Sequence, residues 1–252
     1  MTSSATVRSF RDLLLISPTR ELVMACDSVG GIGPRSGDTY EVDGRDSAHF
    51  AARVPLLETL CAGARPIALV DTLCQDKVSA APLIEEFREI ASDAGIPPEA
   101  VTGSTEDNVQ TTMTGIGVVV LGELDNGLLS GGARPGDLVI CVGLPRSAPH
   151  VRLYRGHPDI VPIADVLALV RSGRVSDALP VGSRGLAWEV PELARTSGLT
   201  ARWTDQEAVP VDASGGPSTC VLISCAPEDE PCLRSIIGND VPWNHVATLE
   251  EA

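Results

Sequence analysis

The sequence predicts an α/β (α+β) protein of two domains, and two observations support this prediction. Strand-length apolar runs and helical patterns follow one another in the order β-α-β-α-β through the first half of the 252-residue chain. A turn at residues 133–137 (ARPGD) then precedes further mixed elements. We therefore expect a first domain at residues 1–132 and a second α/β domain at residues 133–252.

The elements of the first domain follow from its hydrophobic pattern. Residues 21–27 (ELVMACD) indicate a strand that ends at an acid, and the apolar runs 66–73 and 114–123 have strand length. Residues 48–63 are small or apolar at nearly every position, which predicts a largely buried helix. Residues 83–94 are amphipathic, which predicts a helix with one face in water.

The remaining segments are loops of the first domain and elements of the second. Residues 30–38 and 102–108 combine glycines with polar side chains, which favours loops. Apolar runs predict strands at 138–143 and 220–225, and helical spacing predicts helices at 163–171 and 186–197.

Composition and charge limit the classes of function and the compartment. The net charge of −15 argues against non-specific binding to nucleic acid or to anionic lipid. The seven cysteines form no CxxC pair and lie mostly in apolar stretches, which is typical of reduced, buried thiols. No apolar run approaches the roughly 18 residues of a membrane span, so we expect a cytoplasmic protein without membrane contact.

Acidic residues in glycine-rich or apolar surroundings point to magnesium and nucleotide chemistry. Asp27, Glu58, Glu106 and Asp107 are such residues. Mg²⁺ prefers oxygen ligands and is usually held by a few carboxylates together with substrate phosphates. Plain structural roles stay open: Asp27 can cap a turn, and Glu58 can be partly exposed or paired with an arginine.

The glycine-rich loops leave the phosphate-binding mode open. Gly30, Gly31 and Gly33 follow a strand without a helix behind them, which excludes a dinucleotide-binding fingerprint, and no Gly-Lys-Ser/Thr tripeptide exists for a Walker loop. These glycines form either a flexible turn or a loop that closes over phosphates. The segment GSTEDN (103–108) is either a solvated loop or a set of hydroxyls, acids and an amide suited to Mg²⁺ and a triphosphate.

These segments together resemble the superfamily of aminoimidazole ribonucleotide synthetase, thiamine-monophosphate kinase, selenophosphate synthetase and a hydrogenase maturation factor. Asp27 matches the acid after the family's first strand, and Glu58 in PLLETLCAGARP matches an aspartate ahead of a Gly-Ala-x-Pro turn. Residues 102–105 match a Gly-Gly-Asp-Thr-like loop, and RPGDLVICVG matches the domain junction. Pro55 and Leu57 depart from the family's asparagine and serine.

The α-ribazole kinase type is the most similar subgroup, on the segments GSTEDN, TGIGV and PVGSRGLAWE. In the last segment, Ser183 and Arg184 occupy the place of the Asp-x-Ser-Asp-Gly-Leu motif of thiamine-monophosphate kinases. Both acids of that motif are absent and an arginine is present. The resemblance then implies a neutral or anionic acceptor group near Arg184, in place of cationic thiamine phosphate.

The resemblance implies ATP and Mg²⁺ as cofactors, a small-molecule acceptor, and a homodimer formed by the N-terminal sheets. It assigns Asp27 and Arg184 to catalysis. Its metal candidates are Asp27, Glu58, Asp71, Glu106 and Asp107. Its nucleotide-site candidates are Gly30, Gly31, Gly33, Gly103, Ser104, Thr105, Asn108 and Ser183.

Three functions are consistent with this resemblance. The first is a kinase that phosphorylates a primary hydroxyl of a nucleoside-like acceptor such as α-ribazole. The second is an ATP-dependent synthetase that activates an amide or carbonyl oxygen. The third is a nucleotide-binding homologue without catalytic activity. A kinase releases ADP and a phosphorylated product, a synthetase releases free phosphate, and the third function gives binding without turnover.

Overall fold

The computed structural model describes residues 6–10, 13–17, 20–204 and 209–252. The chain divides into two compact units, which we call the first and the second unit. The first unit comprises residues 1–59 and 64–125, and the second comprises residues 60–63 and 126–252. The division expected from the sequence lies a few residues later, between 132 and 133.

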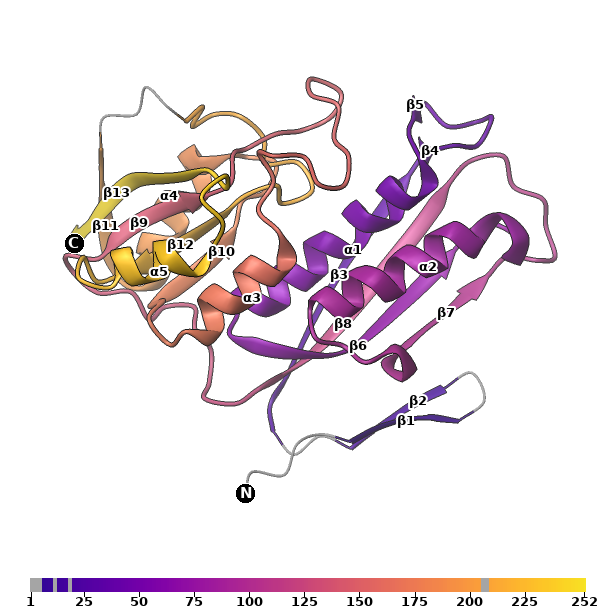
Figure 1. Ribbon diagram of the computed structural model, residues 1–252, viewed down its shortest axis with the longest axis horizontal. Coiled ribbons are helices and arrows are strands. Elements are labelled where there is room, and N and C mark those ends of the chain that lie inside the picture. The colour runs from indigo at the N-terminus through magenta and orange to yellow at the C-terminus, as the bar shows by residue number, and fades with distance from the viewer. Residues whose placement is uncertain (1–5, 11–12, 18–19, 205–208) are drawn as a thin grey trace. The chain divides into compact units, whose positions relative to one another are not determined.

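The first unit is built on a mixed sheet with the strand order β3-β8-β6-β7 (Figure 1). β8 pairs antiparallel with β3 on one side and with β6 on the other, and β7 runs parallel to β6 at the edge. Helices α1 and α2 lie along this sheet (Figure 1). The bounds are β3 Leu22–Gly30, α1 Gly44–Cys61, β6 Ala64–Leu73, α2 Lys77–Asp93, β7 Val101–Thr105 and β8 Gly115–Leu124.

One face of this sheet packs against the helices, and the side chains explain why. In β8, Ile116, Val118 and Val120 are buried, whereas the alternating positions between them are only half-buried. Because side chains alternate between the two faces of a strand, the buried set lies on one face. Buried apolar side chains, among them Leu83 and Phe87, form a stripe along α2, as an amphipathic helix requires.

The opposite face of the sheet is apolar and poorly covered. Leu22 and Met24 of β3 are 39% and 73% exposed. Val119 and Leu121 of β8 are half-buried and pair in register with Cys26 and Met24. Large apolar side chains at such exposure indicate a surface suited to association.

Smaller elements complete the first unit. β1 (Thr6–Phe10) and β2 (Leu13–Ser17) form an antiparallel hairpin. β4 (Ile32–Gly33) and β5 (Tyr40–Glu41) form a short parallel pair that closes the glycine-rich loop after β3. The 3-10 helix η1 (Pro98–Ala100) directly precedes β7.

The second unit is an antiparallel sheet with the order β10-β12-β9-β13-β11. Helix α4 contributes Leu186, Val190 and Leu193 to a core that includes Val139 and Leu222 of the sheet. The bounds are β9 Leu138–Val142, α3 Ile163–Arg171, β10 Asp177–Pro180, α4 Leu186–Thr196, β11 Leu199–Trp203, β12 Val221–Cys225, α5 Glu230–Ile236 and β13 Trp243–Glu251.

Two expectations about local structure near the candidate site are wrong. β3 continues three residues beyond Asp27, because residues 28–30 keep their antiparallel pairing with residues 115–117 of β8. Gly103, Ser104 and Thr105 lie in the edge strand β7 rather than in a loop. Their backbones pair with β6, and this ladder forms although it includes Gly103, a residue type that is depleted in strands.

Two further observations concern the compartment and the thiols. Among the described residues, no helix has the length and apolar character that crossing a bilayer requires. All seven cysteines carry thiols rather than disulfides: Cys61, Cys141, Cys220 and Cys225 are buried, whereas Cys26, Cys74 and Cys232 are exposed. Burial raises the pKa of the Cys225 thiol to about 12, which keeps it unreactive.

Candidate active site of the first unit

Two of the predicted acids lie in one row across the first sheet. Asp27 of β3 and Asp71 of β6 both pair in register with Val118 of β8, one on each side of it. Residues that pair in register point to the same face, and neighbouring strands are about 4.8 Å apart, so the two backbones are about 10 Å apart. The row therefore places two carboxylates on the helix-covered face of the sheet.

Burial changes the acidity of both carboxyl groups. Asp71 is 3% exposed, and desolvation raises its pKa from 3.8 to about 6, although a hydrogen bond from its own backbone and the charge of Arg88 oppose the change. Desolvation also raises the pKa of half-buried Asp27, against a hydrogen bond from the Ser28 backbone. A buried carboxylate is costly unless a cation or a donor compensates its charge. Both residues are thus suited to hold a cation.

Strand β7, at the edge of the sheet, leaves space for the Asp71 side chain. Gly103 pairs in register with Asp71, and a Cβ atom built on Gly103 would come within 2.3 Å of the Asp71 carboxyl carbon. Only glycine leaves room for the carboxyl group at this point. The role of Gly103 is therefore to accommodate Asp71, and its neighbours Ser104 and Thr105 present hydroxyl groups beside it.

A cavity of about 750 Å³ lies at this edge, and we call it the edge cavity. Its lining combines two cationic side chains, Lys77 and Arg88 of α2, with the carboxylates of Asp71 and Asp107. Residues with hydroxyl groups also line the cavity, namely Thr72, Thr102, Ser104 and Thr105, and the rest of the lining is apolar or glycine. Cations and hydroxyls bind phosphate oxygens, and carboxylates bind Mg²⁺.

The start of α2 and the loop after β7 are joined by Asp107. Its carboxylate accepts hydrogen bonds from the Thr105 hydroxyl at 2.6 Å and from the Lys77 backbone N–H at 3.0 Å. These bonds lower the pKa of Asp107, so it stays ionised. Asp76 caps the helix by accepting from the Val78 and Ser79 backbones at 3.0 and 3.1 Å. These hydrogen bonds therefore hold this part of the cavity wall in place.

The glycine-rich loop is held by Asp38, an aspartate that the sequence pattern does not single out. The Asp38 carboxylate accepts from the Thr114 backbone and from the Thr114 hydroxyl, both at 2.7 Å, and from the Arg35 backbone at 2.8 Å. A Cβ atom on Gly33 would lie 2.2 Å from the Thr114 hydroxyl oxygen. Gly31 donates its N–H to the Thr114 carbonyl at 2.9 Å. The loop is thus fixed to the segment before β8, while Gly30 faces open space.

The structure does not bring Glu58 to the row of acids. Its side chain is exposed on α1, in agreement with the partly exposed alternative. Its neighbour Thr59 packs on Gly122, which lies four residues along β8 from Val118. Four residues of an extended strand span about 13 Å. Glu58 therefore lies near the far end of the sheet from Asp27 and Asp71.

Glu106 and Asn108 have local roles. The Glu106 carboxylate accepts from the backbones of Asn108 and Val109 at 2.8 and 3.0 Å, so it stabilises its own turn. Asn108 is exposed. Within the described ranges, no group of three or more His, Cys, Asp or Glu side chains is arranged to hold a metal ion. Mg²⁺ needs only one or two protein carboxylates beside phosphates and water, so Asp71 and Asp107 at the edge cavity fit it.

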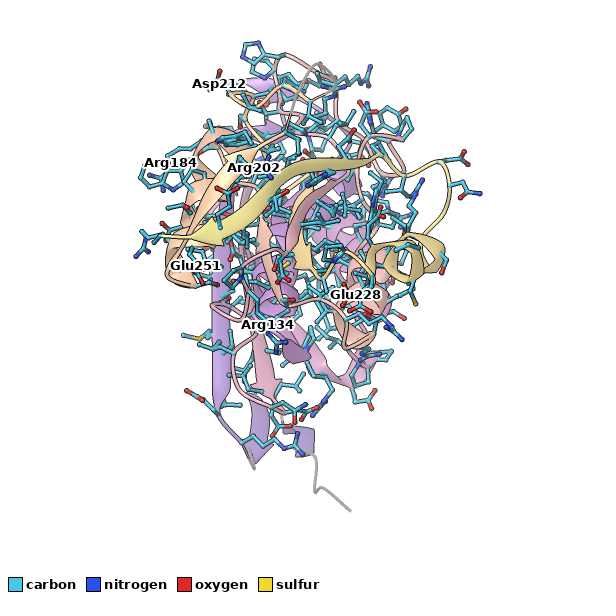
Figure 2. All side chains as sticks on the ribbon, turned by 90° about the vertical axis from the view of Figure 1, so that its left-hand side faces the viewer. Arg134, Arg184, Arg202, Asp212, Glu228 and Glu251 are labelled. Atoms are coloured by element: carbon cyan, nitrogen blue, oxygen red, sulfur yellow. The ribbon has the colours of Figure 1, made fainter. Side chains whose placement is uncertain are left out.

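In the second unit, Ser183 and Arg184 lie on the turn before α4. The Arg184 guanidinium stacks on the exposed Trp188 ring, 3.5 Å from its centroid (Figure 2 shows Arg184). Burial raises the pKa of the Glu189 carboxyl group, and a hydrogen bond from the Gly182 backbone and the charge of Arg184 oppose this change. The arginine is thus accompanied by an acid and by an aromatic ring, and Trp188 is a neighbour that the sequence pattern does not reveal.

The described fold is similar to known structures. Thiamine-monophosphate kinase from Stenotrophomonas maltophilia has a TM-score of 0.72 and 17% identity, over 99% of this chain and 89% of that one. Hydrogenase maturation protein HypE in complex with ATP has a TM-score of 0.67 and 16% identity, over 96% and 80%. T. maritima PurL complexed with AMPPCP has a TM-score of 0.62 and 18% identity, over 91% and 40%. At these identities the likeness shows the fold.

Part of the sequence matches a family model. No curated protein is significantly similar to the chain. Residues 11–124, which include the sheet, the glycine-rich loop and the edge cavity, match the family AIR synthase related protein, N-terminal domain. Most of the first unit therefore matches an AIR synthase related N-terminal domain, and the fold of the chain is similar to that of a thiamine-monophosphate kinase.

Proposed function

We propose that this protein is an ATP- and Mg²⁺-dependent kinase that phosphorylates a primary hydroxyl of a nucleoside-like acceptor. The observation that carries the proposal is the edge cavity, where Lys77 and Arg88 face hydroxyl groups and the carboxylates of Asp71 and Asp107. Phosphoryl transfer requires mainly positioning and charge neutralisation of the phosphates, and this set of groups offers both.

Each side chain of the edge cavity has a distinct part in this proposal. Lys77 and Arg88 would bind phosphate oxygens, and the hydroxyls of β7 would orient them. Asp71 and Asp107 would hold Mg²⁺, which supplies neutralisation of the phosphate charge when bound. Asp27 adds a further carboxylate on the same face of the sheet, across one residue of β8. The anchored glycine-rich loop would keep the neighbouring backbone in place.

Structural neighbours support the choice of ATP. Similar folds were solved for HypE in complex with ATP and for PurL complexed with AMPPCP, and another similar fold belongs to a thiamine-monophosphate kinase. These ligands are bound to the neighbours, and they favour a nucleoside triphosphate as the ligand of the edge cavity.

The acceptor we propose is α-ribazole or a similar nucleoside. Arg184 stands where thiamine-monophosphate kinases carry an acid, and its stacking on Trp188 leaves a cation and an aromatic surface together at the turn before α4. A cationic thiazolium is disfavoured beside a guanidinium, whereas a neutral ribosyl group can accept its hydrogen bonds.

We also propose a homodimer that forms through the uncovered face of the first sheet. Met24→Lys should weaken self-association, because it places a charge within the apolar patch. Val78→Lys is the matched control, since Val78 is 86% exposed on α2 and lies outside that face. Light scattering at micromolar concentration measures the mass of each. A wild-type mass near 26.3 kDa would contradict the dimer.

The function is tested by coupled ADP release with α-ribazole and with thiamine monophosphate. We expect turnover of α-ribazole and none of thiamine monophosphate. Release of free phosphate without a phosphorylated product would favour the synthetase. Binding of ATP by calorimetry without turnover would favour the non-catalytic homologue, and failure to bind ATP with Mg²⁺ at millimolar concentration would remove all three nucleotide functions.

A further inference from the structure

The second unit contains a cavity of about 390 Å³, which we call the turn cavity. Its lining residues come from the segments 128–137, 173–176 and 226–229. These segments meet at the end of the second sheet where β9 and β10 begin and β12 ends, because β12 runs antiparallel to both. Arg184 follows the other end of β10, and it lies well apart from Arg134 in Figure 2. The turn cavity is therefore separate from the proposed acceptor side.

The loop at residues 128–134 is held against the rest of the cavity wall. The Asp177 carboxylate accepts a hydrogen bond from the Gly131 backbone N–H at 2.8 Å. A Cβ atom on Gly132 would lie 2.4 Å from the Ser176 carbonyl oxygen, so only glycine allows this close approach of the two backbones. The wall of the turn cavity is thus formed before any ligand binds, as is usual for sites of small molecules.

One carboxylate of the turn cavity is buried and only partly hydrogen-bonded. Asp137 lines the cavity and is 4% exposed. Its Oδ2 atom accepts from the Arg134 backbone N–H at 3.0 Å. In the described part of the chain, no residue donates to its other oxygen. A buried carboxylate is costly unless a donor or a cation compensates its charge. Asp137 therefore offers the cavity an acceptor for a cationic group.

The two arginines of the turn cavity differ in their partners. The Arg174 guanidinium forms an ion pair with the Asp229 carboxylate. The Arg134 side chain is exposed, and no carboxylate among the described residues pairs with it (Figure 2). A guanidinium presents a planar fork that binds a carboxylate through two parallel hydrogen bonds. Arg134 is thus the cation of this cavity that is available for a carboxylate.

Arg134 and Asp137 are the two ends of one turn. The Asp137 backbone N–H donates to the Arg134 carbonyl at 3.1 Å, which closes a turn of four residues. The Cα atoms at the ends of such a turn are less than about 7 Å apart. A ligand that carries an ammonium group and a carboxylate on the same carbon atom can therefore reach both side chains.

Apolar side chains also line the turn cavity. Leu128 and Leu129 belong to the loop that Asp177 holds, and Val175 lies in the opposite turn. Leu128 is 62% exposed, so a bound apolar group would remove a large apolar side chain from water. The volume lies near the lower end of the range of about 300–1,000 Å³ that ligand cavities span. It suits a small metabolite better than a nucleotide.

We propose that the turn cavity binds an α-amino acid with an apolar side chain. The ammonium group of the ligand donates to Asp137, its carboxylate accepts from Arg134, and its side chain packs on Leu128. This inference goes beyond the proposed function and does not depend on it, because all lining residues belong to the second unit and none of them is an acceptor-side residue. The amino acid is a further ligand and not the phosphoryl acceptor.

Calorimetry on the full chain tests the proposal with L-leucine, L-isoleucine, L-valine and L-methionine at millimolar concentration. The analogues of L-leucine separate the two contacts: 4-methylpentanoate lacks the ammonium group, and 3-methylbutylamine lacks the carboxylate. L-leucine should bind at least about tenfold more tightly than either analogue, because each loses a charge-assisted hydrogen bond. No binding of any of the four amino acids would overturn the proposal.

Two further outcomes of the same titrations would also overturn it. If 4-methylpentanoate binds as tightly as L-leucine, the cavity is a simple anion site and Asp137 does not hold an ammonium group. If tripolyphosphate displaces L-leucine, the cavity is a phosphate site. Binding of L-leucine that neither analogue matches and that tripolyphosphate leaves unchanged supports the assignment.

Variants place the ligand in the turn cavity. Arg134→Gln should weaken the binding of L-leucine at least about tenfold and make it equal to that of 3-methylbutylamine, because the carboxylate then has no partner. Arg152→Gln is the matched control, since Arg152 is another exposed arginine of the second unit and does not line the cavity. Equal affinities for L-leucine in the two variants would mean that the ligand binds elsewhere.

Asp137→Asn and Leu128→Ala test the other two contacts. Asparagine can still accept from the Arg134 backbone, so Asp137→Asn removes the charge without removing the acceptor of the turn. It should weaken L-leucine about tenfold and leave 4-methylpentanoate unchanged. Leu128→Ala should weaken L-leucine several-fold, whereas Ile236→Ala, at an exposed apolar residue outside the lining, should not. Unchanged affinity in Asp137→Asn and Leu128→Ala would contradict the proposed orientation of the ligand.

Discussion

The carboxyl group of Asp71 occupies the place where a side chain of Gly103 would be, since a Cβ atom there would come within 2.3 Å of the carboxyl carbon. This relationship joins two parallel strands, β6 and β7, at the edge cavity. It explains why a glycine stands in an edge strand, where glycine is otherwise unfavourable. Adding even one methyl group at Gly103 would therefore move Asp71, a candidate metal ligand.

Gly103→Ala should therefore displace Asp71 and weaken the binding of ATP with Mg²⁺ by at least about tenfold, because the carboxylate can no longer keep its place. Overpacking of this kind also destabilises the fold by about 1–3 kcal/mol. Calorimetry measures the affinity, and thermal melting measures the stability. Gly238→Ala is the matched control, since a Cβ atom at Gly238 meets nothing within 4 Å. Equal affinities in the two variants would show that Asp71 takes no part in binding.

The raised pKa of Asp71 predicts a specific dependence of stability on pH. A folded-state pKa of about 6 against an ordinary value of 3.8 means that the folded protein binds this proton more tightly. Asp71 thus contributes stability at low pH that is lost as the pH rises from about 4 through about 6. The difference corresponds to at most about 3 kcal/mol at 1.4 kcal/mol per pH unit.

Asp71→Asn removes this titration, so its melting temperature relative to wild type should rise between pH 4.5 and pH 7.5. Asp177 of the second unit is a useful comparison, because burial raises its pKa to about 6 as well. Asp177→Asn should show the same trend with ATP binding unchanged, whereas Asp71→Asn should lose Mg²⁺-dependent ATP binding. A constant difference in melting temperature at all pH values would contradict the assigned acidity of Asp71.

The hydrogen bonds of Asp38 lead to a second prediction, about a variant in which the glycine-rich loop is no longer bonded to Thr114. Asp38→Ala leaves the Thr114 backbone and hydroxyl donors without their acceptor. Loss of a buried acceptor typically costs about 1–3 kcal/mol. We expect lower stability and increased amide hydrogen exchange in residues 30–38 and 112–115. Glu99→Ala, an exposed acid before β7, should change neither, and unchanged exchange in Asp38→Ala would show that other contacts hold the loop.

The sequence predicts those elements whose pattern is set by burial. Helix α3 lies at residues 163–171 as predicted, and β8 differs from its prediction by one residue at each end, because both bury a regular apolar stripe or alternation. For β7 the sequence predicts a loop instead. Val101, Thr102 and Thr105 favour strands, but Gly103 and the polar side chains give no apolar alternation. The pairing of β7 with β6 is a tertiary contact that no local pattern reveals.

The same distinction applies to the candidate site. The resemblance points to Asp71 and residues 103–105, and the structure brings them together with Asp107 at one cavity. Asp38 has no comparable signal, because its partner Thr114 lies 76 residues away in the sequence. The sequence does not predict a role for Trp188 for a similar reason, because that role depends on the stacking of Arg184 on its ring. Such roles depend on contacts rather than on residue type.

The acceptor side of the proposed reaction depends on Arg184. Arg184→Ala should lower kcat/KM for α-ribazole at least about tenfold through the loss of a hydrogen-bonding cation. The Kd for ATP should stay within about twofold, because the variant lies in the second unit and leaves the edge cavity intact. Arg202→Ala is the matched control: Arg202 is an exposed arginine of the same unit, on β11, where it pairs with Glu250.

Arg184→Asp restores the sign of charge that thiamine-monophosphate kinases carry at this position. It should abolish turnover of α-ribazole and allow measurable turnover of thiamine monophosphate, because the repulsion of the thiazolium is replaced by attraction. Steady-state kinetics with both acceptors decide between these outcomes. Equal losses in Arg184→Ala and Arg202→Ala would mean that Arg184 acts only as surface charge, and the acceptor would then have to be sought at another part of the second unit.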